Sequence, residues 1–278
     1  MKKNRSKKIS TYSVSLYVLF FVIAAVFLYW TTYCTNEQSD EEEKPEPVRK
    51  KVTIVRPSKK LAIVIDDIGY DLSAVERLLD LDIPITLSVL PYCPYSEAAA
   101  RKAHQAGREV MLHIPMEPKG YPGTNPGEGA LLLSMTKREI EDKLTHAMDS
   151  VPFISGANNH MGSRFMEDKE KVQTVLAALK KRNLYFLDSV TTSQSKGRQA
   201  ALATGIRYGT RDIFIDNSHE TEDTCTSIRH IINQSTKWEM LVAIGHPYKT
   251  TVAALARVLP DLHKKGIALV PLSEIIGP

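Results

Sequence analysis

The sequence predicts an α/β barrel of about seven or eight parallel strands, and three observations carry this prediction. From residue 60 onwards, short apolar segments alternate with helical segments, which is typical of a parallel sheet. Residues 61–65 (LAIVI) form a continuous apolar run, as expected of a strand that is buried on both faces. This strand ends in Asp66 and Asp67, whereas a dinucleotide-binding sheet would carry a glycine-rich turn there.

The residues before this domain predict a membrane anchor and a linker. Five of the first eight residues are basic, and residues 12–33 carry no charge over 22 positions, a length that can cross a bilayer as a helix. A cleaved signal peptide is the alternative, but the residues before Cys34 offer no small-residue cleavage site. Because basic residues stay on the cytoplasmic side, we expect a single-pass protein of the inner membrane with a periplasmic domain. The expected segments are a cytoplasmic tail (1–11), a signal anchor (12–33), a charged linker (34–60) and the domain (61–278).

Charge and cysteine content exclude other classes of protein. The chain has a net charge of +4, from 36 basic and 32 acidic side chains, but five of the basic ones lie in the N-terminal tail. The rest is near neutral, so nothing indicates a nucleic-acid partner. The three cysteines are too few for a disulfide scaffold, and the sequence leaves open whether Cys93 and Cys225 pair.

Within the domain, the elements follow from local patterns. Thr136 and Glu139 form a capping box at the start of one helix, and Gly107 and Gly266 each follow the end of another. Four prolines exclude a long helix from residues 115–133. The expected strands are 61–65, 85–90, 109–114, 154–158, 185–188, 213–215, 241–245 and 267–271. The expected helices are 71–81, 96–106, 137–149, 168–182, 199–204, 224–235 and 251–265.

Nearly every expected strand ends in a side chain that can bind a metal ion or move a proton. A histidine or aspartate at one strand end usually has a structural explanation, but a parallel barrel gathers all these ends on one rim. One aspartate and two histidines would form an open three-ligand site for zinc or a similar divalent ion. A nearby carboxylate and a further histidine would supply the base and the acid of a metal-assisted hydrolysis. In chain order these residues are Asp66, Asp67, His113, Asn158, Asn159, His160, Asp188, Asp216 and His246.

Several segments resemble motifs of a known family. LAIVIDDIGY (61–70) resembles the first motif of the NodB-homology polysaccharide deacetylases, in which a strand ends in paired aspartates. GREVMLH (107–113) is similar in spacing to the family's segment with the first metal histidine, and IGHP (244–247) resembles its last motif. With its HIPMEP, NNHMGS and RDIFIDN segments, the domain most resembles the divergent polysaccharide deacetylase (YibQ-like) branch of this carbohydrate esterase superfamily.

This resemblance implies a deformed (β/α)7 barrel and a hydrolase that uses a divalent metal ion, zinc by our expectation, to deacetylate an N-acetylated cell-envelope polysaccharide. It implies that Asp66 is the base, that Asp67 and His113 bind the metal ion, and that His246 is the acid. The family's second metal histidine lies four residues after the first, and here that position is Glu117. We infer that His160 supplies the missing ligand, with Glu117 as the alternative.

The remaining rim residues are expected to have supporting roles. We expect Asp188 to orient the acid His246. Asn158, Asn159, Asp216 and Glu117 form the expected substrate-binding set.

Two other interpretations stay open. The first is a catalytically silent barrel that binds envelope glycan or an envelope protein. Two departures from the family pattern favour it: Glu117 replaces a metal histidine, and Asn158 lies in the run that replaces an arginine of the family's third motif. The second is a glycoside hydrolase that uses Asp66 and Asp188, which would leave three rim histidines without a role and would need no metal ion.

Overall fold

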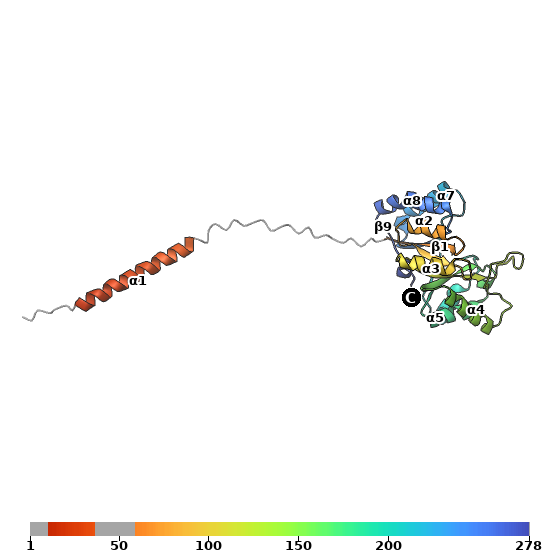
Figure 1. The fold of residues 1–278 in the computed structure, drawn as a ribbon, viewed down its shortest axis with the longest axis horizontal. Coiled ribbons are helices and arrows are strands. Elements are labelled where there is room, and N and C mark those ends of the chain that lie inside the picture. Colours follow the sequence, from red (N-terminus) through yellow and green to blue (C-terminus); the bar gives the residue numbers. More distant parts are fainter. Residues whose placement is uncertain (1–10, 37–58, 278) are drawn as a thin grey trace, which may run out of the picture. The chain divides into compact units, whose positions relative to one another are not determined.

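The computed structural model describes residues 11–36 and 59–277 (Figure 1). The chain divides into two compact units, residues 1–54 and 55–278. The predicted cytoplasmic tail up to residue 10 and most of the predicted linker, residues 37–58, lie outside the described residues.

The first unit contains one helix, α1, Thr11–Asn36, among its described residues. In the described part of the chain, no helix has both the length and the apolar character that crossing a membrane requires. The transmembrane helix predicted for residues 12–33 therefore has no support from the structure.

The second unit is built on one sheet in which all pairings between strands are parallel. Its hydrogen-bonded order is β6-β5-β4-β3-β2-β1-β8-β7, and β9 pairs with the beginning of β1. The strands are β1 Lys59–Ile68, β2 Thr86–Val89, β3 Glu109–Met116, β4 Ile154–Met161, β5 Tyr185–Asp188, β6 Tyr208–Thr210, β7 Ile213–Phe214, β8 Met240–Gly245 and β9 Ile267–Leu269.

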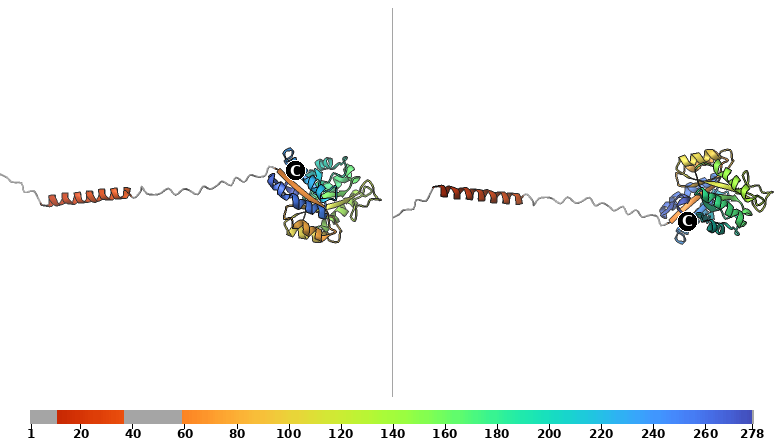
Figure 2. Two further views of the ribbon diagram at one scale, coloured as in Figure 1. Left: turned by 90° about the horizontal axis from the view of Figure 1, so that it is seen from above. Right: turned by 90° about the horizontal axis from the view of Figure 1, so that it is seen from below.

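Helices surround this sheet, as Figures 1 and 2 show. Each helix presents an apolar face to the sheet, as α5 does with Val172, Val175 and Leu179. The capping box of Thr136 and Glu139 forms as predicted. The α-helices are α2 Leu72–Leu79, α3 Ser96–Gln105, α4 Lys137–Ser150, α5 Lys169–Lys181, α6 Gly197–Thr204, α7 Thr221–Asn233 and α8 Lys249–Lys264. Short 3-10 helices lie at η1 Phe165–Glu167, η2 Ser235–Lys237 and η3 Leu272–Glu274.

The sheet is curled, so that its two edge strands, β6 and β7, follow each other closely in the chain. β6 pairs with β5 and β7 pairs with β8, although only Arg211 and Asp212 separate β6 from β7. Between them, Arg211 N donates to Asp188 O and Asp212 N donates to Val242 O. The predicted parallel, barrel-like α/β fold is thus confirmed as a curled sheet. The prediction missed β6, which has only three residues.

Both faces of β1 are buried, which explains its continuous apolar run. Ile63 and Ile65 belong to the main core between sheet and helices, whereas Ala62 and Val64 face the second core inside the curl. Leu272 and Ile276 belong to that inner core as well, and Leu272 N donates to Thr86 Oγ1 at the start of β2. The C-terminal segment therefore fills the end where the strands begin, and the end where they finish is left for the site.

Two local predictions need correction or completion. β1 does not end at residue 65, because it continues through both aspartates to Ile68, with an irregular register after Ile65. Cys93 and Cys225 are free thiols, so they do not form the disulfide that the sequence left open.

Candidate metal and catalytic site

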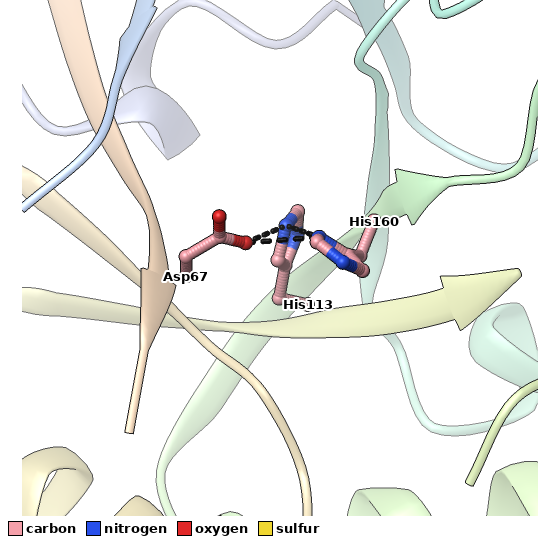
Figure 3. Close-up of side chains that lie close together, drawn as sticks. All are labelled: Asp67, His113 and His160. Atoms are coloured by element: carbon pink, nitrogen blue, oxygen red, sulfur yellow. Dashed lines mark hydrogen bonds and ion pairs between the residues drawn. The ribbon is translucent and has the colours of Figure 1, made fainter. Parts of the chain in front are cut away.

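Three side chains that the sequence predicted as ligands converge toward the end of the sheet where the parallel strands finish. Asp67 lies on β1, His113 on β3 and His160 on β4, and Figure 3 shows them pointing toward one another. Asp67 Oδ1 lies 3.1 Å from His113 Nε2 and 2.9 Å from His160 Nδ1. The two imidazole nitrogens are 3.1 Å apart.

An unusual backbone conformation brings Asp67 to this site. Successive side chains of a regular strand point to opposite faces, so Asp66 and Asp67 should diverge. Asp67 instead has a φ of 57°, in the left-handed region, where the β1–β2 register is irregular. The side chain is thereby turned toward the rim that Asp66 also faces. Such a conformation costs about 1–3 kcal/mol in a residue other than glycine, and it is found preferentially at functional sites.

The cluster fits a divalent metal ion. Asp67 Oδ1 is buried, yet it makes no hydrogen bond to any residue in the described ranges. Two ligand atoms about 2.1 Å from an ion at a tetrahedral angle lie about 3.4 Å apart, so small adjustments of Asp67, His113 and His160 would admit one. Among the described residues, this is the one group of histidine, cysteine and acidic side chains close enough to hold an ion.

Electrostatics also favour a cation here. Burial lowers the pKa of His113, but the charges of Asp66 and Asp67 outweigh it and raise that pKa to about 9. Burial raises the pKa of the Asp67 carboxyl, but the close imidazoles of His113 and His160 outweigh it and hold that pKa well below its usual range. The two carboxylates therefore favour positive charge at the site. When no metal ion is bound, protons supply that charge.

A buried amide connects the first histidine to the expected base. Asn158 Oδ1 accepts from Ser88 Oγ at 2.6 Å and lies 2.7 Å from His113 Nδ1, which acts as the donor to it. Asn158 Nδ2 donates to Asp66 Oδ1 at 2.8 Å. With a metal ion in place of the second imidazole proton, this arrangement would present a bare His113 Nε2 to the ion, in the way that outer hydrogen bonds commonly orient metal ligands.

Asp66 is buried beside the cluster with one oxygen facing it. Its Oδ1 is held by Asn158, and its Oδ2 lies 3.7 Å from His113 Nε2. Burial is the main cause that raises the pKa of the Asp66 carboxyl, although the charge of His113 opposes it. The position is that of a carboxylate that can take a proton from a molecule bound at the cluster.

His246 lies across the cluster, directly after β8. Its Nε2 is 4.0 Å from Asp67 Oδ2, and its Nδ1 is 3.1 Å from Asp216 Oδ1. Asp216 Oδ2 accepts from His246 N at 2.6 Å and from Thr251 Oγ1 at 2.8 Å. Burial lowers the pKa of His246, but the hydrogen bond and charge of Asp216 raise it more, so the imidazole keeps its proton to a higher pH than it otherwise would.

These contacts correct the roles expected for two carboxylates. Asp188 does not orient His246, because its oxygens accept from Ser195 Oγ, from Tyr208 OH and from the backbone N–H of Val190. Asp216 orients the histidine instead, so it is not a sugar contact. Because Asp188 is engaged in these bonds, the alternative of a glycoside hydrolase that uses Asp66 and Asp188 lacks its second carboxylate.

Three further residues of the expected substrate-binding set make their polar contacts inside the protein. Asn158 and Asn159 are buried and bonded within it, the latter to Ser189 N and Met161 O. Glu117 points away from the cluster. It accepts from Leu133 N at 2.7 Å and forms an ion pair with Arg164 at 3.0 Å. Of the two alternatives for the third ligand position, the structure therefore brings His160 to the cluster and not Glu117.

Sequence reasoning missed two polar residues that support the site. Ser88 bonds to Asn158 and Thr251 bonds to Asp216. Ser88 has a visible signal, because it is a polar residue near the end of TLSV, a strand whose four residues are all buried. Thr251 lies five residues after His246 and gives no such signal.

Comparisons with known proteins found a matching family profile and similar sequences. The profile of the family described as divergent polysaccharide deacetylase matches residues 63–276. The uncharacterized protein YibQ of Escherichia coli (strain K12) is 36% identical over 218 residues, which are 78% of this chain and 67% of that protein. An uncharacterized protein of Haemophilus influenzae is 34% identical over 203 residues, 73% of this chain and 72% of that protein.

Solved structures share the fold. An uncharacterized protein from Agrobacterium tumefaciens C58 superposes with a TM-score of 0.74 at 24% identity, over 78% of this chain and 89% of that one. A CE4 family pseudoenzyme from Bacillus anthracis superposes with a TM-score of 0.50 at 13% identity, over 79% of this chain and 66% of that one. At these identities, the likeness extends to the fold alone.

Proposed function

This chain belongs to the divergent polysaccharide deacetylase family, and from that membership and the geometry of its rim we propose that it is a metal-dependent hydrolase. It would remove acetyl groups from an N-acetylated cell-envelope polysaccharide. The observation that carries the proposal is the cluster of Asp67, His113 and His160. A buried carboxylate and a carboxylate-paired histidine lie on either side of it.

Asp67, His113 and His160 would hold the ion, and we propose zinc because two imidazoles and one carboxylate suit it. When bound, such an ion polarises a carbonyl group and makes water more acidic. The strained backbone of Asp67 and the bond from His113 to Asn158 hold two of these side chains in place before any ion arrives.

Asp66 would be the general base. Its Oδ2 faces the cluster, while Asn158 Nδ2 fixes its Oδ1. It can therefore accept the proton of a water molecule that attacks the acetamide carbonyl carbon. A positioned base of this kind typically contributes about 10²–10⁴-fold to the rate.

His246 would be the general acid. Asp216 holds its Nδ1, so Nε2 is the atom that faces the cluster and can protonate the departing amine. The raised pKa of His246 supports this role, because the acid must carry its proton when the carbon–nitrogen bond breaks.

A silent barrel that binds the glycan without cleaving it is the second candidate. The observation in its favour is Glu117, which stands where the wider family has a metal histidine and is instead paired with Arg164. Two properties of the rim support the enzyme over it, namely that His160 completes a three-ligand cluster without Glu117 and that a base and an acid lie in reach.

The test measures metal content and acetate release together on the purified full-length chain. We expect about one divalent ion per chain by elemental analysis, release of acetate from N-acetylated glycan fragments, and loss of both after treatment with a chelator. An activated acetyl ester, run in parallel, detects a site that is competent but lacks the right glycan. A chain that is loaded with metal and releases acetate from neither compound would leave only the binding function.

The location of the domain is a separate proposal. We propose that residues 12–33 anchor the protein in the inner membrane with residues 36–278 on the periplasmic side, because five basic residues precede an uncharged segment of 22 residues. Protease added to intact spheroplasts should then digest the domain. A domain that survives until the membrane is permeabilised would refute this orientation.

A further inference from the structure

Arg211 is a half-buried cation beside the candidate site that has no ion pair with any described residue. It follows β6, at the same end of the sheet as the metal cluster. Removing a charge from water is unfavourable unless hydrogen bonds or an opposite charge compensate, and burial indeed lowers the pKa of Arg211. An arginine in this setting needs an explanation.

The carboxylates near Arg211 are already engaged elsewhere. Their charges partly offset the effect of burial on its pKa, and one of them is the expected base Asp66. Asp66 is bonded to Asn158, Asp188 to Ser195 and Tyr208, and Asp212 Oδ2 to Val242 N at 2.7 Å. None of the three neutralises the guanidinium by direct contact.

Two backbone carbonyl groups hold the guanidinium in place, but they do not engage all of its N–H donors. Its Nε donates to Ser189 O at 2.8 Å and its Nη2 to Val190 O at 3.1 Å. A guanidinium has five N–H groups, and Nη1 makes no hydrogen bond to a residue in the described part of the chain. Arg211 therefore keeps donors for a further partner.

Aromatic contacts connect this position to the catalytic side of the rim. The Arg211 guanidinium carbon lies 3.9 Å from the centre of the Phe214 ring. The Phe214 ring is in turn 6.0 Å from the His246 ring and inclined to it by only 21°. The cation thus lies one aromatic ring away from the imidazole that would protonate the leaving amine, within the span of one or two sugar units.

We infer that Arg211 binds an anionic substituent of the substrate, a carboxylate or a phosphate carried close to the acetamide that is cleaved. This inference rests on the proposed deacetylase function and narrows its substrate to an acidic N-acetylated glycan. The planar fork of a guanidinium matches both anions and pairs with them more strongly than with neutral oxygens. The backbone bonds to residues 189 and 190 hold that fork still, which lowers the entropy lost on binding.

The experiment compares matched glycans on the purified full-length chain and its variants. The glycans are a neutral N-acetylated oligosaccharide, the same oligosaccharide with a carboxylate substituent, and the same with a phosphate substituent. Initial rates give kcat and KM for acetate release, and calorimetry gives the dissociation constant of each glycan. Arg211→Gln should raise the KM and Kd of the charged glycans by about 10- to 100-fold. The neutral glycan offers no anion to Arg211, so its KM and Kd should rise much less than those of the charged glycans.

Two further variants control for charge and folding. Arg138→Gln removes an arginine that is 91% exposed on α4, and it should leave every value unchanged. Arg211→Lys keeps the charge but not the fork, and it should fall between wild type and Arg211→Gln. If Arg211→Gln does not fold, the same comparison on Arg211→Lys decides. The preference for the charged glycans should also weaken as salt is added.

The outcomes separate this inference from the proposed function. Equal losses on neutral and charged glycans would mean that Arg211 only holds residues 189 and 190, and no loss on either charged glycan would mean that it binds no anion. Either result overturns the inference while the deacetylase stands. If the wild type releases no acetate at all, the proposed function fails, and calorimetry alone still tests whether Arg211 recognises the anion. The larger of the two effects shows whether the substituent is a carboxylate or a phosphate.

Discussion

Removing the Asn158 amide should weaken metal binding although this side chain touches no ion. Asn158 is fully buried and bonds on one side to His113 Nδ1 and on the other to Asp66 Oδ1, at 2.7 and 2.8 Å. In Asn158→Ala, no acceptor would hold the proton on His113 Nδ1. The tautomer that presents an unprotonated Nε2 to the cluster would then no longer be favoured. The loss of such an outer partner typically lowers metal affinity or activity by about 10- to 100-fold.

The same change should destabilise the fold by an amount that follows from the lost bonds. Asp66, His113 and Ser88 would each keep a buried polar atom without its partner, at about 1–3 kcal/mol apiece. The free energy of unfolding should therefore fall by roughly 3–9 kcal/mol. Urea unfolding of the chelated protein measures this loss, and competition with a chromophoric chelator measures the affinity for zinc.

Asn159→Ala is the matched control. Asn159 is the next residue, is equally buried and bonds to Ser189 N and Met161 O, but it touches neither His113 nor Asp66. It should lower stability and leave the zinc affinity within about threefold of wild type. If both variants weaken zinc binding equally, or if Asn158→Ala binds zinc like the wild type, the reasoning about the His113 tautomer is wrong.

The remaining predictions concern the ligands, the base and the acid. His160→Ala should lose most of its bound metal, whereas His104→Ala, on helix α3, should keep it; equal metal content in the two would exclude His160 as a ligand. Asp66→Asn should keep its metal and lose about 10²–10⁴-fold in the rate of acetate release, so a rate equal to wild type would mean that the base is another group. Asp216→Asn removes the charge that raises the pKa of His246. Activity that needs protonated His246 is lost as the pH rises through this pKa, so the alkaline limb of the pH profile should move to lower pH, and an unmoved limb would contradict the assignment of the acid.

Much of the fold and part of the site follow from local sequence patterns. The apolar run of residues 61–65 predicts a strand buried on both faces, and each side of β1 does face a core. Because parallel strands finish at one edge, the same pattern predicts that Asp67, His113 and His160 meet there, and they do. These predictions hold because the parallel direction of the strands follows from their alternation with helices, which the sequence shows plainly.

The tertiary structure decided which way each side chain at a strand end points. Asp188 and Asp216 both follow short apolar strands, yet only Asp216 reaches His246, because β7 pairs with β8 while Asp188 is bonded to Tyr208 on β6. The sequence did not indicate that residues 208–214 would divide into two strands with different partners.

The left-handed backbone of Asp67 is equally invisible in the sequence, although it brings this carboxylate to the same rim as Asp66. Strand ends can be placed from the periodicity of apolar residues, because burial of the whole segment determines them. The direction of a single polar side chain depends on the register and on hydrogen bonds to residues distant in the chain, such as those of Asn158 and Glu117. Those interactions exist only once the sheet has curled.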